Sequence, residues 1–408
     1  MSEDLKLNKA FCVIPWLHLH VMPDSTVIPC CVSPYHDLYG DVSKQKVAEI
    51  WNSDRFKELR TQMIKGELPP GCKHCHDLET AGFRSMRQGM NYKFEKDIPT
   101  FIANTDPQGH YQEIKLKYID IRFSNLCNFK CRGCSPALSS SWYDDHAKAF
   151  GYTPTRPKVL NVASDSPDFW RHFQELALDA EFIYFGGGEP LITKEHFDLL
   201  RLLIAKGRTD VDLTYNTNLS TLTYGNNNLI DLWDKFRSVT LGISIDDLGN
   251  RAEYFRSGTK WQTLVTNLET LRDRYPRIQR YVNCTVNLTN VYYLPELFTY
   301  LTSQRFIGPE QFNINLLLDP DEYRIDVLPV KAKFFVMQKL QKFVDQLLRN
   351  KCEKAAHDFR NIVSHMMKVD NSRLLPQFYE RTRKLDELRG EAFVRTYPEL
   401  SKLVNFPA

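Results

Sequence analysis

The chain has 408 residues, 42% of them hydrophobic and 25% charged, enough for one barrel-sized domain with smaller domains beside it. Its net charge of +3 comes from interspersed acidic and basic residues, so the composition indicates no nucleic-acid partner. No apolar run approaches the ~20 residues of a membrane-spanning helix, and the segment 11–22 is too short and too polar for a signal peptide, so we expect a cytoplasmic protein without a membrane partner.

The first predicted element is a β-hairpin over residues 13–30 with its turn at residues 23–26. Its first arm alternates Leu17-His-Leu-His-Val21, and this period of two is typical of a half-buried strand. His18 and His20 fall on the polar face of that strand. We therefore expect both imidazoles to face solvent.

Four cysteines near the N-terminus are predicted to form one metal site. The hairpin lets Cys12 and Cys30 face each other, and Cys72-x-x-Cys75 follows a predicted helix. Cys31 could replace Cys30, but the alternation of a strand lets only one of the two point inward, and we favour Cys30. Four thiolates can hold a structural zinc ion or an iron–sulfur cluster.

A three-cysteine loop follows the next predicted strand. Residues 97–111 read as a linker, and residues 114–123 alternate apolar and polar side chains as a strand does. Directly after this strand come Cys127, Cys131 and Cys134. Three thiolates at this spacing can hold three irons of a [4Fe–4S] cluster, whereas most such sites supply four. The fourth iron then has an open coordination position, where a metal site does chemistry.

A second strand leads into a glycine-rich turn. The segment 181–190 is an apolar run that breaks into three glycines, a carboxylate and a proline, and a helix is predicted over residues 194–206. Strand, turn and helix together make a βα unit. Because βα folds carry their active sites at the carboxyl ends of strands, the cysteine loop and the glycine turn both lie where an active site is expected.

The Cys-x3-Cys-x2-Cys loop followed by Gly187-Gly-Glu-Pro190 resembles a radical S-adenosylmethionine (SAM) enzyme, over roughly residues 112–320. In that family SAM chelates the open iron through its amino and carboxylate groups, and one electron from the cluster releases a 5′-deoxyadenosyl radical that abstracts hydrogen from a substrate. The resemblance implies an electron donor such as flavodoxin or ferredoxin. It assigns the cofactor contacts to Gly187, Gly188, Glu189, Asn218, Ser244, Asp246 and Arg256.

One position departs from the family. The residue before the third cysteine is commonly bulky and packs beside the adenine, but here it is Gly133. That packing must come from elsewhere, for which Phe129 is the candidate. No general base stands out among the carboxylates, so the catalytic residue is left unassigned.

The N-terminal cysteines, with the run 47–60 before the Cys-x-x-Cys motif, resemble the twitch or SPASM-type auxiliary domain of radical SAM enzymes. The domain here precedes the barrel, which it normally follows, and Ser25 replaces the usual turn glycine. The resemblance favours an auxiliary [4Fe–4S] cluster, with zinc as the alternative. Its ligands are expected to be Cys12, Cys30, Cys72 and Cys75.

We therefore expect an α/β fold: a partial (β/α)6 TIM-like barrel with a small N-terminal cysteine-rich auxiliary domain and a helical C-terminal segment. About six strands are too few for a closed eight-stranded barrel. From Val330 onward the apolar residues follow a helical period. The expected units are an auxiliary domain at 1–96, a linker at 97–111, the barrel at 112–325 and helices at 326–408.

The resemblance implies an oxidoreductase-like enzyme that cleaves SAM reductively and abstracts hydrogen from its substrate. We expect oxidation or cross-linking of a peptide or protein side chain, because this auxiliary domain is often associated with peptide maturation. An auxiliary cluster held by four thiolates would then accept or relay electrons. Two alternatives stay open, namely oxidation or rearrangement of a small polyol or sugar derivative and a non-enzymatic Fe–S or zinc scaffold.

Overall fold

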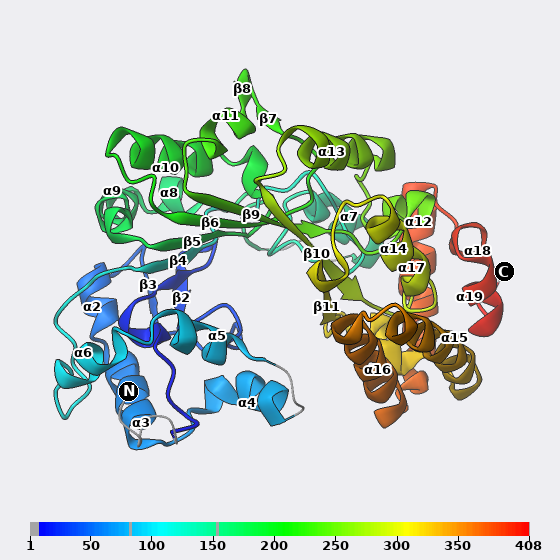
Figure 1. Cartoon of the computed structure of the whole chain (residues 1–408), viewed down its shortest axis with the longest axis horizontal. Helices are drawn as coiled ribbons and strands as arrows, with labels where there is room; N and C mark the ends of the chain where they lie inside the picture. The colour runs from blue at the N-terminus through cyan, green and yellow to red at the C-terminus, as the bar shows by residue number, and fades with distance from the viewer. Residues whose placement is uncertain (1–7, 81–83, 152–154, 408) are drawn as a thin grey trace.

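The computed structural model describes residues 8–80, 84–151 and 155–407. In this part of the chain one large sheet crosses the molecule, with helices above it and the N-terminal and C-terminal elements at its two ends (Figure 1). Its strand order is β11-β10-β9-β6-β5-β4-β1-β2-β3. The strands are β1 (His20–Val21), β2 (Thr26–Ile28), β3 (Gly40–Asp41), β4 (Tyr118–Ile121), β5 (Phe182–Phe185), β6 (Asp212–Thr217), β9 (Ser238–Ser244), β10 (Gln279–Val286) and β11 (Phe312–Leu316), with β7 (Thr223–Tyr224) and β8 (Asn227–Asn228) as a separate hairpin.

In the described sheet, the six strands from β4 to β11 run parallel and alternate with helices along the chain. This arrangement is the partial (β/α)6 barrel that the sequence predicts, so the fold class is confirmed. The helices between these strands are α7 (Trp142–Phe150), α8 (Val162–Asp165), α9 (Pro167–Leu176), α10 (Lys194–Ala205), α11 (Leu229–Trp233), α12 (Gly249–Phe255), α13 (Trp261–Arg274) and α14 (Leu294–Ser303).

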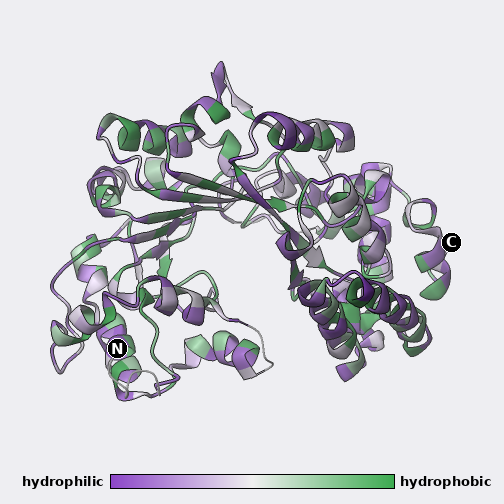
Figure 2. Cartoon of the chain, viewed as in Figure 1, coloured by the Kyte–Doolittle hydropathy of each residue, from purple (hydrophilic) through white to green (hydrophobic). Residues whose placement is uncertain are grey.

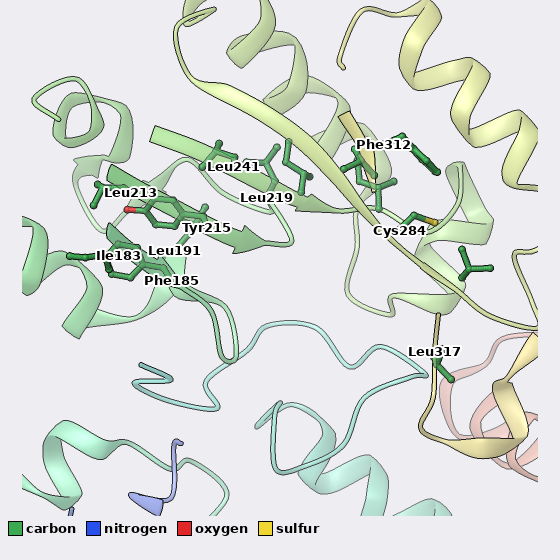
Figure 3. Close-up of a cluster of buried hydrophobic side chains, with 14 of the residues drawn as sticks. Ile183, Phe185, Leu191, Leu213, Tyr215, Leu219, Leu241, Cys284, Phe312 and Leu317 are labelled. Carbon is green, nitrogen blue, oxygen red and sulfur yellow. The ribbon is translucent and has the colours of Figure 1, made fainter. Parts of the chain in front are cut away.

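The barrel strands have one apolar and one polar face because their side chains alternate. On β6, Leu213 and Tyr215 are buried in the cluster that also holds Ile183 and Phe185 (Figure 3). Helices such as α10 and α13 carry hydrophobic and hydrophilic stripes, as amphipathic covering helices do (Figure 2). Each fully buried side chain of this kind contributes roughly 1.5–3 kcal/mol. The polar side chains on the opposite face of the strands are available to bind ligands.

The N-terminal elements extend the barrel sheet. β1 pairs in parallel with β4, with His20 opposite Asp120, and antiparallel with β2, which confirms a short form of the predicted hairpin. In the turn between β1 and β2, Ser25 has φ 70°, the left-handed conformation that usually needs glycine. The nearby helices are α2 (Val47–Trp51), α3 (Asp54–Lys65), α4 (Lys73–Thr80), α5 (Met86–Lys93) and α6 (Ile98–Ala103), the last within the expected linker.

His18 and His20 are buried, so the expectation that they face solvent was wrong. Their exposed fractions are 0% and 1%. β1 lies between β2 and β4, and the ring of Tyr118 stacks on His18 with centroids 4.4 Å apart. The period of a single strand does not show what packs on its polar side chains, which here includes the ring of Tyr118. Burial lowers the pKa of His18 to about 3, so this ring is neutral.

The C-terminal segment is helical from Val330 onward, as predicted. It packs at the β11 end of the sheet (Figure 1). Its helices are α15 (Val330–Arg349), α16 (Glu353–Lys368), α17 (Leu375–Arg389), α18 (Phe393–Thr396) and α19 (Pro398–Leu403). Across the residues that the structure describes, no helix combines the length and the apolar character needed to cross a membrane.

Candidate active site

One pocket opens at the carboxyl ends of the barrel strands, where βα folds place their active sites. Its lining includes the three thiols of the cluster loop, Cys127, Cys131 and Cys134. It also includes every residue that the resemblance assigns to the cofactor, namely Gly187, Gly188, Glu189, Asn218, Ser244, Asp246 and Arg256. Residues that are far apart in the chain therefore meet in one place.

The cluster loop is held in shape by hydrogen bonds from side chains to its backbone. The loop runs over residues 122–141 without a helix or strand, all within the described chain. Ser141 Oγ donates to the carbonyl of Cys127 at 2.6 Å, and Trp142 Nε1 donates to the carbonyl of Cys131 at 2.6 Å. Two of the three cysteines are thus fixed through their own carbonyl groups, which sets the direction in which their thiols leave the loop.

The glycine-rich turn holds the cluster loop from the other side. The N–H of Gly188 donates to the carbonyl of Ser124 at 3.0 Å, and the N–H of Glu189 donates to that of Leu126 at 2.8 Å. A Cβ on residue 188 would lie 2.1 Å from the Leu126 carbonyl oxygen, so only glycine permits this approach. The Gly-Gly-Glu segment therefore positions the loop as well as presenting a carboxyl group.

Glu189 is a buried carboxyl group held by three donors. It accepts from the N–H of Asn218 at 2.7 Å, from Thr217 Oγ1 at 2.7 Å and from the N–H of Leu191 at 3.1 Å. Burial raises its pKa to about 7, although these hydrogen bonds favour the ionised form. The charge of this group therefore changes near neutral pH.

Asp246 and Arg256 form an ion pair at the pocket. Arg256 Nε lies 2.7 Å from Asp246 Oδ2, and its Nη2 donates to Oδ1 at 3.1 Å. The remaining Nη1 lies 3.9 Å from Cys131 Sγ. Burial raises the pKa of the Cys131 thiol, and the guanidinium of Arg256 opposes that rise. Two residues that the sequence predicts as separate cofactor contacts thus hold each other, and Arg256 also reaches the cluster loop.

Leu317 and Phe255 also line the pocket, and neither was predicted from the sequence. A Cβ on Gly133 would lie 2.6 Å from Leu317 Cδ1 and 3.3 Å from Phe255 Cζ. These two side chains occupy the space that a bulky residue at position 133 would take, and Phe129 lines the same pocket. Gly133 was the available signal, because a small residue at a usually bulky position implies a large neighbour from another segment.

Substitution of Gly133 by phenylalanine is expected to destabilise the fold by about 1–3 kcal/mol, because the new ring overpacks the space that Leu317 fills. Adding Leu317→Ala should recover most of that loss. Thermal unfolding of Gly133→Phe, Leu317→Ala and the double variant measures this coupling. Strictly additive losses would show that the two positions do not share the space.

The inner wall of the barrel beside the pocket is polar, and its residues were not predicted from the sequence. Arg122 and Asn216 line the pocket, and Asn283 Nδ2 donates to Asn216 Oδ1. Arg122 Nε pairs with Asp120 Oδ1 at 3.0 Å. A Cβ on Gly186 would lie 2.2 Å from Arg122 Nη1, so the neighbouring strand end makes room for this guanidinium. The wall suits a ligand with hydrogen-bonding groups.

The N-terminal thiols line a second cavity. Of the described cysteines, Cys12, Cys30, Cys72 and Cys75 line it, whereas Cys31 does not. Cys31 Sγ lies instead 3.4 Å from Met86 Sδ. In residues 8–80, 84–151 and 155–407, no three His, Cys, Asp or Glu side chains are close enough together to hold a single metal ion.

Both sets of thiols suit iron–sulfur clusters chemically. Thiolates are soft ligands that select iron–sulfur clusters and zinc. The thiols must lose their protons to bind metal, and burial holds those protons in place until metal displaces them. Burial raises the pKa to about 12 at Cys30, Cys72, Cys127 and Cys134. The carboxyl groups and the guanidinium of the pocket likewise fit SAM, which carries an ammonium group, a carboxylate and ribose hydroxyls.

A short series of neighbouring side chains connects the two cavities. Cys31 follows Cys30 in the chain and contacts Met86, and both of these neighbours line the auxiliary cavity. Burial, the charge of Asp120 and a hydrogen bond to Asp120 raise the pKa of the Cys31 thiol. Asp120 in turn pairs with Arg122, which lines the active-site pocket. Only two side chains, Cys31 and Asp120, therefore lie between Cys30 and Arg122.

Known proteins match both regions. Residues 121–294 match the Radical SAM superfamily, and residues 12–76 match SPASM, an iron–sulfur cluster-binding domain. A curated relative is GTP 3′,8-cyclase from Campylobacter curvus, 28% identical over 159 residues that cover 38% of this chain and 43% of that protein, so the chain matches less than half of its length.

Similar solved structures include native anSMEcpe with bound AdoMet, which is 15% identical with a TM-score of 0.36 over 56% of this chain and 58% of that one. Another is SuiB of Streptococcus suis bound to precursor peptide SuiA. It is 13% identical with a TM-score of 0.38 over 73% of this chain and 64% of that one.

The fold and the pocket thus define a radical SAM domain, whose cofactors are a [4Fe–4S] cluster and SAM. An SPASM domain with an auxiliary iron–sulfur cluster precedes it, which confirms the N-terminal placement expected from the sequence. Residues 121–294 accordingly form a radical SAM domain, and residues 12–76 form an SPASM domain that precedes it.

Proposed function

We propose that the protein is an oxidoreductase that oxidises or cross-links a peptide or protein side chain. Its [4Fe–4S] cluster would be held by Cys127, Cys131 and Cys134, with SAM bound beside it. When bound, these groups supply reductive cleavage of SAM and hydrogen abstraction from the substrate. The observation that carries the proposal is the single pocket in which the three thiols meet every residue assigned to SAM.

The side chains of the pocket have distinct roles in this proposal. Glu189, once ionised, attracts the ammonium group of SAM, and Arg256 offers its permanent charge to the carboxylate through Nη1, the nitrogen that Asp246 does not hold. Asn218 and Ser244 offer hydrogen bonds to the ribose. Leu317, with Phe255, supplies apolar surface beside the cluster loop and keeps water from it.

The auxiliary cluster is proposed to accept an electron. Abstraction of one hydrogen atom leaves a substrate that must lose a second electron if the product is to be oxidised or cross-linked. Four thiols line the auxiliary cavity. A single twitch-like [4Fe–4S] cluster there would have a thiolate on every iron, so no iron would be open to bind substrate. The contacts from Cys31 through Asp120 to Arg122 support a role in electron transfer from the active site.

A peptide is the favoured substrate class. The SPASM domain favours it, and the amide groups of Asn216 and Asn283 on the inner wall can pair with a peptide backbone. A small polyol or sugar derivative is the second candidate, because the same polar wall can also bind hydroxyl groups. Flavodoxin or ferredoxin is the proposed electron donor.

Formation of 5′-deoxyadenosine by the reconstituted protein tests this function. The anaerobic protein, reduced with dithionite or flavodoxin, is expected to produce it. Candidate precursor peptides should raise the yield and lose two hydrogen atoms in mass spectrometry, whereas polyols should do neither. Iron-loaded protein that produces none would be a scaffold.

The affinity for SAM is expected to rise between about pH 6 and about pH 8. Burial raises the pKa of Glu189 to about 7, so the group is neutral below this pH and gains its charge as the pH rises. Glu189→Gln should weaken binding roughly tenfold and remove this dependence, since it deletes one charge-assisted contact. Equilibrium dialysis of SAM measures both effects, with Glu181→Gln as the exposed control. If the SAM affinity of Glu189→Gln rose with pH as steeply as that of the wild type, the assignment of Glu189 to the ammonium group of SAM would be contradicted.

A further inference from the structure

Helix α17 reaches the cluster loop from outside the pocket. Arg132 follows Cys131 directly in the loop, and its side chain is fully buried. Arg132 Nη2 pairs with Asp386 Oδ1 and with Glu391 Oε2, each at 2.5 Å. Its guanidinium also lies 3.7 Å from the ring centroid of Tyr254. A cation next to a cluster thiol is therefore held by the C-terminal end of α17 and the residues that follow it.

The same helix also reaches the residue on the other side of Cys131. Lys130 Nζ lies 2.9 Å from Asp145 Oδ2, and Arg389 Nε lies 2.9 Å from the same oxygen. The Arg389 guanidinium also lies 4.8 Å from the ring of Trp142, whose Nε1 donates to the carbonyl of Cys131. Side chains of α17 thus act on both chain neighbours of this thiol and on its carbonyl.

The carboxylate that receives Arg132 is itself fixed. Asp386 accepts from the hydroxyl of Tyr254 at 2.7 Å and from the N–H of Phe393 at 2.7 Å. The loop is fixed as well, because the N–H of Arg132 donates to the carbonyl of Phe255 at 2.7 Å. An ion pair between two fixed groups transmits position better than one between mobile surface groups.

The charges behind the loop balance, because the cations Lys130, Arg132 and Arg389 face the carboxylates Asp145, Asp386 and Glu391. Asp386 and Glu391 are two carboxylates facing the single guanidinium of Arg132. Net charge near an iron–sulfur cluster is one of the factors that set its reduction potential. Removal of one carboxylate from this balanced set leaves an excess of positive charge, which favours the addition of an electron and raises that potential.

We propose that Arg132 is a positioning residue through which α17 sets the place of Cys131 and the reduction potential of the cluster. The C-terminal helices then belong to the electron-accepting site as well as to the fold. This inference rests on the proposed function, because it requires a cluster at the three thiols of the loop.

Asp386→Asn and Arg389→Met test the two contacts separately. Asp386→Asn leaves Arg132 paired with Glu391, so the guanidinium is not left alone in the interior. Glu380→Gln is the matched control, because it removes an exposed ion pair with Lys384 on the same helix. The measurements are iron and sulfide content, the electron paramagnetic resonance (EPR) spectrum and the midpoint potential. A variant with alanine at the three loop cysteines supplies the reference spectrum of the auxiliary cluster.

Asp386→Asn is expected to shift the midpoint potential of the radical SAM cluster in the positive direction and to change its EPR signal. Arg389→Met should lower the occupancy of that cluster, so that total iron falls by up to about half while the auxiliary signal is unchanged. Glu380→Gln should match the wild type. Arg132→Lys keeps a buried cation and therefore the fold, but it lacks the fork of arginine, so it should alter the EPR signal as well.

Wild-type iron content, EPR signal and potential in Asp386→Asn and Arg389→Met would overturn the inference. Loss of both clusters together with a lower unfolding temperature of the metal-free variants would also overturn it, because the contacts would then serve folding in general. If the wild-type protein itself takes up no cluster at the three loop thiols, the proposed function fails instead.

Discussion

Alanine at Cys127, Cys131 and Cys134 together is expected to lower 5′-deoxyadenosine formation at least about 100-fold, because the reaction would lose its electron donor and its binding site for SAM. The three thiols line one pocket with Glu189 and Arg256, and they stand at the carboxyl end of β4. Bound iron should fall by about half, since one of two clusters is lost. Chromatography of the reaction products and iron analysis measure these two effects.

Cys352→Ala is the matched control for this triple variant. The Cys352 thiol lies beside the carbonyl of Asn350 at 3.6 Å, at the start of α16, and it lines neither cavity. Its iron content and its 5′-deoxyadenosine yield should equal those of the wild type. A triple variant that still produces 5′-deoxyadenosine at the control rate would refute the assignment of the cluster to this loop.

The second large effect is expected at Cys30, with its neighbour Cys31 as the control. Cys30 lines the auxiliary cavity with Cys12, Cys72 and Cys75, whereas the Cys31 thiol contacts Met86. Cys30→Ala should therefore lose the auxiliary cluster and about half of the bound iron. It should still cleave SAM but form no oxidised product, because the second electron has no acceptor. Cys31→Ala should keep its iron.

Iron and sulfide analysis, with EPR spectra of the reduced proteins, distinguishes the two thiols. Loss of iron only in Cys31→Ala would show that Cys31, and not Cys30, is the ligand of the auxiliary cluster. Equal losses in both variants would mean that the thiols act together, against the structure, in which Cys30 lines the auxiliary cavity and Cys31 does not. Product formation by Cys30→Ala at the wild-type rate would remove the electron-accepting role.

Much of the active site could be predicted because its signals are local in the chain. The spacing of Cys127, Cys131 and Cys134 follows from the geometry of one loop, and the glycines before Glu189 follow from the close approach of two backbones. The order of strands and helices fixes which strand ends meet, since parallel neighbours place their carboxyl ends at one edge. The six parallel strands of the partial barrel therefore agree with the expected fold class.

The rest depends on contacts between distant segments, which a single sequence does not display. Arg132 meets Asp386 across 254 positions of the chain, and no periodicity links them. Leu317 reaches Gly133 from the end of the last barrel strand. His18 was misplaced for the same reason, because its burial depends on the pairing of β1 with a strand about a hundred residues later.

The pairing of β1 with β4 has a consequence for any shortened form of this protein. A chain that began after residue 96 would leave one side of Tyr118–Ile121 without its neighbouring strand. Unpaired N–H and C=O groups along a strand are a template for pairing with another molecule. The isolated barrel would therefore tend to aggregate, and its loss of activity would say little about electron flow. Point substitutions of single thiols avoid that ambiguity because they leave β4 paired with β1.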